Sequence, residues 1–457
     1  MNAKLFDTIT AICTPFGSGA IGIIRLSGED SFPIAKKVFI SKQKVEVKKL
    51  ILGRIVNPLN NEIIDPSVFA VYFKNPDSYT GEDVVELSCH GGVFILQKVL
   101  EAVLNSGARL AEPGEFTKRA FLNGKLNLLE AESINDLVQA KTEKALNLAR
   151  LQYLGLLSSS LNNIKHSLIN SLVEVESYID FAMDDIERFP YKNVAEMLDK
   201  TYLSISKIVD SYKFGSMIKH GIKVLIVGKP NVGKSSLLNA FVGKKRAIVT
   251  KKPGTTRDYI EEVVDFNGLA VRFIDSAGIR KTDDEIESIG VFQTKKLIKN
   301  SDIILFVLDV SEDLSSDDFE IQSEILEKEV IYVLNKIDIF AKFNENDVKR
   351  IFNGRSIISV SAKNGTGIND LIQASIKVIG VDKVNENEII TNLRHKKLLE
   401  KCKTSVKNAI SLLLIGALPE VISMELNEAV LQINEILGEG VMDDILDKLF
   451  SRFCIGK

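Results

Sequence analysis

The residues with the clearest capacity for chemistry form one short loop, Gly228-Lys-Pro-Asn-Val-Gly-Lys-Ser-Ser236, which has the GxxxxGK[ST] spacing. Its glycines leave room for backbone N–H groups to curl around phosphate oxygens, and the N-terminus of a following helix adds positive potential. Lys234 can reach the β- and γ-phosphates, and the Ser235 hydroxyl can bind Mg²⁺. The loop predicts a nucleoside triphosphate site rather than an ordinary tight turn between a strand and a helix.

Further motifs follow in the order that a guanine-nucleotide site requires. They are Gly254-Thr-Thr-Arg-Asp258, Asp275-Ser-Ala-Gly278, Asn335-Lys-Ile-Asp338 and Ser361-Ala-Lys363. Thr256 can complete the Mg²⁺ shell, Asp275 can hold a Mg²⁺-bound water, and the Gly278 N–H can meet the γ-phosphate. The Asp338 carboxylate can accept hydrogen bonds from guanine N1–H and the exocyclic amine, whereas adenine would leave it unpaired. Together the motifs predict a domain that binds GTP.

These motifs also define which residues should contact the nucleotide and its metal. The predicted nucleotide-binding residues are Gly228, Asn231, Val232, Gly233, Lys234, Ser235, Ser236, Thr256, Asp275, Ser276, Ala277, Gly278, Asn335, Lys336, Asp338, Ser361 and Ala362. Ser235 and Thr256 are the predicted Mg²⁺ ligands, because their hydroxyl oxygens suit a hard cation.

The residues alone leave the catalysis of hydrolysis open. Small GTPases place a glutamine after the DxxG motif to orient the attacking water, but Ile279 stands there in this chain. Glu287 can orient that water, directly or through a second water, or can belong to a solvated acidic loop ahead of a helix. Developing charge can be stabilised by Arg257 in cis, or by a monovalent cation bound to the side-chain carbonyl of Asn231.

Strand-length apolar segments precede most of these motifs and must position them. The segments are 223–227, 271–275, 303–309, 330–335 and 357–361. Helix-length segments alternate with them, which is typical of a doubly wound, mostly parallel sheet. Because ligands of such sheets bind at the carboxyl ends of the strands, the motifs are expected to meet along one edge.

The rest of the chain shows two other sequence patterns. Residues 1–118 contain short apolar strands broken by proline and glycine, with one helix after Gly92, and predict an α+β domain. Helical periodicity then dominates residues 119–217 and returns in 382–457. We therefore predict a multidomain protein in which a Ras-like P-loop GTPase domain, residues 218–381, is inserted into a discontinuous helical domain.

Composition narrows the classes of protein that this chain can belong to. The 457 residues carry 58 Lys and Arg against 61 Asp and Glu, a net charge of −3 that excludes a basic nucleic-acid coat protein. The four cysteines, Cys13, Cys89, Cys402 and Cys454, form no CxxC pair, so a reduced chain without zinc is expected. No signal or transit peptide and no membrane-length apolar run is apparent. We expect a cytoplasmic protein.

Several longer stretches of the chain are more specific than these short motifs. They are Asp7-Thr-Ile-Thr-Ala11, Gly22-Ile-Ile-Arg-Leu-Ser-Gly28, Tyr79-Thr-Gly-Glu-Asp-Val-Val-Glu-Leu87, His90-Gly-Gly92, Glu112-Pro-Gly-Glu-Phe-Thr-Lys-Arg-Ala-Phe-Leu-Asn-Gly-Lys125 and Phe453-Cys-Ile-Gly-Lys457. Together they resemble one family, the MnmE (TrmE) tRNA-modification GTPases. The departures from the family pattern are small. Ser276 and Ile279 replace a threonine and a leucine, and Lys252-Pro253 precede Gly254 where other sequences vary.

The resemblance implies an N-terminal domain that is similar to folate-dependent one-carbon enzymes, dimerises and binds a tetrahydrofolate derivative. The matching folate-binding positions are Arg25, Glu86, Lys125 and Lys457. Arginine and lysine can bind the carboxylates of the folate tail, while Glu86 can accept hydrogen bonds from pterin N–H groups. Without the resemblance, Arg25 and Glu86 look like ordinary strand charges. Cys454 is either a nucleophile or a packed thiol.

The resemblance also implies how hydrolysis is activated. Family members hydrolyse GTP when two G domains meet, and K⁺ fills the role of an arginine finger. The matching K⁺ ligands are Asn231, Thr250, Lys252 and Thr255, of which Thr250 and Thr255 join the nucleotide-binding set. Glu287 matches the catalytic glutamate of the family.

The implied partner is an FAD protein of the MnmG (GidA) type, in a heterotetramer or a larger complex with a homodimer of this chain. Together they would add an aminomethyl or carboxymethylaminomethyl group to C5 of the wobble uridine, with tRNA bound through the complex. Two alternatives stay open: a ribosome-assembly GTPase acting as a switch, and an aminomethyl transferase whose G domain is purely regulatory.

Overall fold

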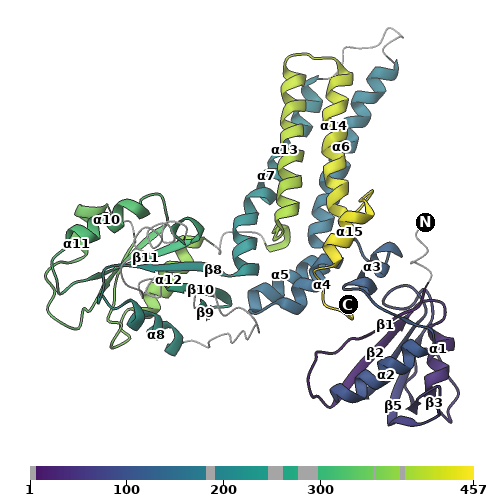
Figure 1. Cartoon of the computed structure of the whole chain (residues 1–457). Helices are drawn as coiled ribbons and strands as arrows, with labels where there is room; N and C mark the ends of the chain where they lie inside the picture. The colour runs from purple at the N-terminus through teal and green to yellow at the C-terminus, as the bar shows by residue number, and fades with distance from the viewer. Residues whose placement is uncertain (1–6, 182–190, 245–260, 276–296, 354–355, 381–385) are drawn as a thin grey trace, which may run out of the picture. The chain divides into compact units, whose positions relative to one another are not determined.

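The computed structural model describes residues 7–181, 191–244, 261–275, 297–353, 356–380 and 386–457 (Figure 1). The chain forms two compact units. One comprises Met1–Asn135, Gln152–Leu161 and Val430–Lys457, and the other comprises Asp136–Leu151 and Asn162–Ala429. Each unit thus gathers segments that are distant in sequence. The predicted boundaries after residues 118, 217 and 381 divide the chain in another way and remain a prediction.

The first unit is built on a seven-stranded sheet in the order β3-β4-β5-β6-β2-β1-β7. Its strands are β1 (Ile9–Ile12), β2 (Ile21–Ser27), β3 (Phe39–Ile40), β4 (Ile51–Val56), β5 (Ile63–Phe73), β6 (Val84–His90) and β7 (Arg109–Leu110). Helices α1 (Ser31–Val38) and α2 (Val93–Asn105) pack on one face, because alternate strand residues such as Leu26, Tyr72 and Leu87 are apolar and buried there. The α+β prediction is confirmed.

The opposite face of this sheet carries apolar side chains that none of the described residues covers. Leu52 of β4 and Phe69 of β5 are register partners, and their residues are 47% and 43% exposed. Apolar residues in adjacent register on an uncovered sheet face are typical of an interface.

The C-terminal segment packs against the part of the chain that follows this sheet. Helices α3 (Glu115–Leu122), α4 (Leu128–Gln139) and α15 (Asp443–Phe450) contribute Phe121, Leu128, Leu446 and Phe450 to one apolar cluster. Gly114 has a φ of 70°, and a Cβ there would lie 2.7 Å from the Phe450 carbonyl oxygen. Only glycine permits this close approach, which brings the last residues of the chain beside α3.

The second unit contains long helices and the GTPase sheet. The helices are α5 (Glu143–Tyr153), α6 (Leu156–Phe181), α7 (Tyr191–His220), α13 (Leu393–Leu414) and α14 (Pro419–Leu437), of which α5, α6 and α14 extend into the first unit. Helix α7 packs along α13, Ser167 of α6 shares a hydrogen bond of 2.7 Å with Thr201 of α7, and Ser423 of α14 bonds Glu176 of α6 (Figure 1). Helices from both sides of the GTPase segment therefore pack together, as expected of a discontinuous helical domain.

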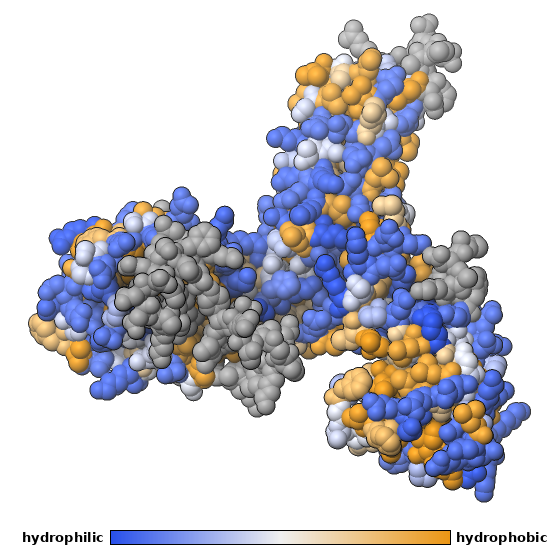
Figure 2. All heavy atoms as spheres, viewed as in Figure 1, coloured by the Kyte–Doolittle hydropathy of each residue, from blue (hydrophilic) through white to orange (hydrophobic). Residues whose placement is uncertain are grey.

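The turn between α13 and α14 ends this bundle with exposed apolar side chains. Leu414, Ile415, Leu418 and Met424 are all exposed, and Figure 2 shows orange side chains at this tip. The sequence analysis did not predict this patch.

The GTPase sheet has six strands in the order β13-β12-β11-β8-β10-β9. They are β8 (Ile222–Val227), β9 (Glu261–Phe266), β10 (Leu269–Asp275), β11 (Ile303–Asp309), β12 (Val330–Asn335) and β13 (Ile357–Ser359). All neighbours are parallel except β9 and β10. The predicted mostly parallel sheet is confirmed. The sequence analysis missed β9, whose Glu-Glu-Val-Val-Asp-Phe sequence is too polar to resemble a buried strand, and β13 ends two residues before the predicted Ser361.

Two apolar cores cover the two faces of this sheet. Helices α8 (Lys234–Lys244) and α12 (Ile368–Ile379) pack on one face with Val224, Ile226 and their neighbours. Helices α10 (Ser316–Ile325) and α11 (Glu345–Phe352) pack on the other face with Leu225 and Val227. Strands buried on both faces explain the continuous apolar runs in the sequence and confirm a doubly wound fold. A short 3₁₀ helix, η4 (Glu386–Glu388), leads towards α13.

Candidate functional site

The phosphate-binding loop joins the end of β8 to the start of α8, as predicted. Gly228 has a φ of 150°, and a Cβ on it would lie 2.4 Å from the Val307 carbonyl oxygen. Gly233 has a φ of 98°, and its Cβ would lie 2.3 Å from Asn335 Nδ2. Side chains at these positions would clash with the neighbouring strand ends, so the loop requires both glycines. Asn231, with a φ of 64°, completes the turn.

Lys234 lies at the first residue of α8 with its ammonium group over the loop. Its Nζ donates hydrogen bonds to the carbonyl oxygens of Gly228, at 2.8 Å, and Lys229, at 2.6 Å. Phosphate oxygens can replace these carbonyls as acceptors of the same charged group, with stronger charge-assisted bonds. Ser235 and Ser236 follow in the first turn of α8 and are exposed, so the Ser235 hydroxyl is accessible to a metal ion.

Asn335 links the phosphate-binding loop to residues 361–363, which are predicted to hold the base and are called the base-binding loop below. Its Nδ2 donates to the Val232 carbonyl at 2.8 Å, and its Oδ1 accepts from the Ala362 N–H at 3.0 Å. The residue is almost completely buried, so these bonds replace contacts with water. One amide thus fixes the distance between the triphosphate end and the base end of the site.

Asp338 and Lys336 lie on the same turn after β12. The Ser361 hydroxyl donates to Asp338 Oδ1 at 2.6 Å, and this bond is the main reason that the pKa of Asp338 is lowered. The carboxylate is therefore charged at neutral pH and can accept hydrogen bonds from guanine. Lys336 has a φ of 67°, and its Nζ lies 2.5 Å from Asp309 Oδ2.

Asp309 is a site residue that the sequence analysis missed. It ends β11 in register with Asn335, is 5% exposed, and also accepts from the Ser311 hydroxyl at 2.6 Å. Burial opposes its ionisation, but the bonds from Lys336 and Ser311 lower the pKa of Asp309 overall. The signal in the sequence was an acidic residue at the end of an apolar strand, next to the strand that carries the base-recognition motif.

Several predicted site residues lie outside the described residues. They are Thr250, Lys252, Thr255, Thr256, Arg257, Ser276, Ala277, Gly278, Ile279 and Glu287. Asp275 ends β10, but nothing is described of its side chain. The predicted Mg²⁺ and K⁺ shells, the water-orienting glutamate and the nucleotide contacts of Lys234 and Asp338 therefore stay predictions.

A second cluster lies on β2 and β6 of the first unit. Arg25 and Glu86 are register partners, with Arg25 Nε 2.8 Å and Nη2 2.7 Å from Glu86 Oε1. The Arg25 guanidinium also lies 4.9 Å from the centre of the Tyr79 ring and 5.5 Å from that of Phe116. The two predicted folate residues are thus brought together, and each partly neutralises the other.

The C-terminal residue approaches the same cluster. The Phe116 N–H donates to the Lys457 carbonyl at 3.2 Å, and a Cβ on Gly456 would lie 2.4 Å from the Ile12 carbonyl oxygen. The pKa of Lys457 is lowered, chiefly by burial and further by the nearby charge of Arg25. Lys125 instead donates from Nζ to the Pro76 carbonyl at 3.0 Å, and no described contact joins it to the other three residues.

Cys13 and Tyr79 belong to this cluster but were not predicted as site residues. Burial raises the pKa of the Cys13 thiol, although Arg25 opposes the rise, so the thiol is neutral at physiological pH. The Tyr79 hydroxyl shares a hydrogen bond of 2.9 Å with the Thr117 hydroxyl. Cys454 is exposed. Nothing in the local sequence distinguishes Cys13, because its proximity to the cluster depends on the pairing of β1 with β2.

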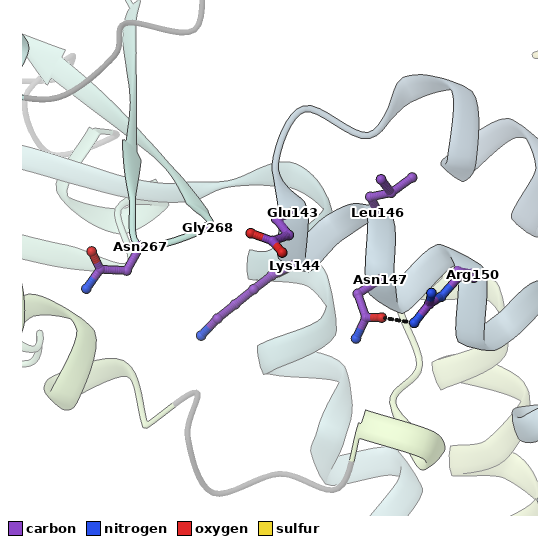
Figure 3. A pocket seen from close by; sticks show the side chains of 7 residues that line it. All are labelled: Glu143, Lys144, Leu146, Asn147, Arg150, Asn267 and Gly268. Carbon is purple, nitrogen blue, oxygen red and sulfur yellow. Dashed lines mark hydrogen bonds between the residues drawn. The ribbon is translucent and has the colours of Figure 1, made fainter.

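A cavity of about 550 Å³ lies in the second unit. Residues of α5 and of the turn between β9 and β10 line it: Glu143, Lys144, Leu146, Asn147, Arg150, Asn267 and Gly268 (Figure 3). Arg150 donates to Asn147 Oδ1 at 2.9 Å in its wall. None of the predicted site residues lines it.

No group of three or more His, Cys, Asp or Glu side chains in the described ranges is arranged to hold a metal ion. None of the helices described is both long enough and apolar enough to cross a membrane.

Family models match nearly the whole chain. The model of the MnmE helical domain matches residues 128–454, and the model of the N-terminus of the GTP-binding protein TrmE matches residues 8–125.

Full-length relatives agree with the family models. This chain is 41% identical to the tRNA modification GTPase MnmE of Thermoanaerobacter pseudethanolicus, over 99% of this chain and 100% of the relative. It is 43% identical to the protein of the same name from Aquifex aeolicus, with the same coverage. The one from Clostridioides difficile is 41% identical, over 99% of both chains. With a phosphate-binding loop, a guanine pocket and a match from end to end, the chain belongs to the MnmE family.

Proposed function

We propose that this protein hydrolyses GTP as an enzyme of tRNA modification. The observation that carries the proposal is the double hydrogen bond of Asn335, which holds the phosphate-binding loop and the base-binding loop at one separation. Relatives with that activity in their names cover the same length of chain. In this site Lys234 would bind the phosphates and Asp338 would select guanine.

We further propose that the protein works in the cytoplasm with an FAD protein of the MnmG type. The complex, a heterotetramer or larger, would bind tRNA and place an aminomethyl or carboxymethylaminomethyl group on C5 of the wobble uridine. The near-neutral charge of the chain fits a complex in which the partner contacts much of the RNA. Nucleoside analysis of tRNA from a deletion strain tests the proposal, because retention of the modified uridine would contradict it.

The same proposal includes Mg²⁺ and K⁺. Ser235 is accessible in the first turn of α8 and would bind Mg²⁺ with Thr256, where the ion would neutralise phosphate charge. Asn231 is exposed in a left-handed turn of the loop and would bind K⁺ with Thr250, Lys252 and Thr255. A monovalent cation there would stabilise the negative charge that develops during hydrolysis.

GTP turnover is therefore expected to be at least about tenfold faster in K⁺ than in Na⁺, since the two ions differ in size and in preferred ligand distance. The measurement is steady-state GTP hydrolysis at constant ionic strength and Mg²⁺ concentration. Measuring GTP affinity in both salts is the control, because the effect should lie in kcat. Equal turnover in the two salts would remove the cation from the mechanism and favour Arg257.

We propose that the N-terminal sheet forms a homodimer. The open face that carries Leu52 and Phe69 supports this, because apolar side chains on an uncovered face gain free energy when a second copy covers them. Sedimentation of the full chain at micromolar concentration should show a dimer, and a monomer would contradict the proposal.

We also propose that the cluster around Arg25 binds a tetrahydrofolate derivative, which would supply the one-carbon unit. Arg25 and Lys457 provide two cations for carboxylates, and Glu86 provides an acceptor for N–H groups. The rings of Tyr79 and Phe116 already pack against Arg25 and hold its guanidinium plane.

Arg25→Ala is expected to weaken binding of a reduced folate to the full chain about 10- to 100-fold, the usual cost of losing a hydrogen bond to a charged group. Titration calorimetry measures the affinity, and circular dichroism checks the fold. Arg54→Ala is the matched control, because Arg54 is an exposed arginine of β4 in the same sheet. An Arg25→Ala protein that binds as tightly as the wild type would refute the assignment.

A further inference from the structure

A buried ion pair joins the phosphate-binding loop to helix α10, which carries none of the GTP-binding motifs. Lys229 is the second residue of the loop, and its Nζ lies 2.9 Å from Asp318 Oδ2. The side chain of Lys229 is 13% exposed and that of Asp318 is 0% exposed. A pair this deeply buried is weakly screened by water.

Asp318 is fixed by its own helix. It is the third residue of α10, and its Oδ2 accepts hydrogen bonds from the Ser315 N–H at 2.9 Å and from the Ser315 hydroxyl at 3.2 Å. Its Oδ1 has no hydrogen-bond partner among the described residues. The carboxylate charge is therefore balanced mainly by Lys229, and removal of that lysine would leave a buried charge without a counterion.

Lys229 is also joined to the phosphate-binding lysine. The Lys229 carbonyl accepts from Lys234 Nζ at 2.6 Å, next to the Gly228 carbonyl at 2.8 Å. The loop is held at Gly228 by its close approach to Val307 and at Lys229 by Asp318. The backbone N–H groups of residues 229–235 must point at phosphate oxygens, so the position of this first turn decides whether they converge.

We infer that Asp318 is a positioning residue for GTP binding, which holds the phosphate-binding loop in its receptive shape through Lys229. Asp318 itself does not touch the nucleotide. The inference rests on the proposed function, since it concerns the affinity for GTP and GDP. It adds to the site a residue of α10 that none of the motifs contains.

The test is the affinity for a fluorescent GDP analogue in the full chain, measured together with the melting temperature of the nucleotide-free protein. Lys229→Met is expected to weaken binding about tenfold or more, because several charge-assisted bonds to phosphate depend on the loop, and to lower the melting temperature. Lys229→Arg should keep most of the affinity. Lys342→Met, which breaks the exposed pair with Asp313, is the matched control and should change neither quantity.

The double variant Lys229→Met with Asp318→Asn separates positioning from stability. It removes both charges, while the asparagine oxygen can still cap α10. We expect the melting temperature to recover and the affinity to remain low. Recovery of both together would mean that the pair only stabilises the domain, and wild-type affinity in Lys229→Met would mean that Asp318 is only a helix cap. Either result overturns the inference. A wild-type protein that binds no guanine nucleotide would overturn the proposed function as well.

Discussion

Asp338→Asn is expected to lower the affinity for GTP by about 10²- to 10⁴-fold, because the carboxylate would make two charge-assisted hydrogen bonds to guanine, each worth about 1.5–3 kcal/mol. The Asp338 carboxylate can accept from both guanine N–H groups, and its lowered pKa keeps it ionised at neutral pH. An asparagine amide offers one acceptor and one donor, and the donor faces the exocyclic amine of guanine. Xanthine carries an oxygen at that position, so xanthosine triphosphate should bind the variant better than GTP does.

Titration calorimetry with GTP, ATP and xanthosine triphosphate measures this change. Asp370→Asn is the matched control, since it removes an exposed carboxylate from the first turn of α12 in the same domain. If Asp338→Asn binds GTP within a factor of a few of the wild type, guanine is selected by other groups. Because the pKa of Asp338 is depressed in the folded protein, GTP affinity should be constant near neutral pH. It should decline only as the pH falls towards that lowered value.

Glu287→Ala is expected to keep the affinity for GTP and to lose roughly 10²- to 10⁴-fold in kcat, the range for a group that positions or deprotonates the attacking water. The residue that follows the DxxG motif is Ile279, which cannot orient water. Single-turnover hydrolysis in K⁺ measures the loss, and equilibrium binding of a non-hydrolysable analogue shows whether affinity is unchanged.

Two further variants test whether the loss of kcat is specific to Glu287 and whether Glu287 orients the water or takes its proton. Glu285→Ala removes a neighbouring carboxylate of the same acidic stretch and should leave kcat close to the wild-type value. Glu287→Gln keeps the shape and one acceptor, so partial activity would indicate that the residue orients water rather than takes its proton. An unchanged kcat in Glu287→Ala would show that another group positions the water.

The interpretation from sequence was most successful where the signal is local. The phosphate-binding loop needs glycines at fixed positions between a strand and a helix, and the residue types that identify it all lie within residues 228–236. The alternation of apolar strands with helices also identified the doubly wound sheet, because strands buried on both faces must be continuously apolar. The edge strand β9 was missed because Glu261, Glu262 and Asp265 leave its sequence without a long apolar run.

Contacts between side chains that are distant in the sequence could not be predicted either. Arg25 and Glu86 are 61 residues apart in the chain, and their contact requires the register between β2 and β6. Lys457 approaches the same cluster because α15 packs on α3 and Gly114 allows the close contact. Neither relation has a local signature, because each depends on the docking of separate elements.

The sequence by itself determined the chemistry of the nucleotide site, the succession of element types and the resemblance to one family, because these depend on residue types at short spacing. Only the tertiary structure decided which charges neutralise one another: Arg25 with Glu86, Lys336 with Asp309 and Lys229 with Asp318. An ion pair forms where folding brings two side chains within about 4 Å. That distance is set by strand register and helix packing, so it cannot be inferred from the residues that are adjacent in the chain.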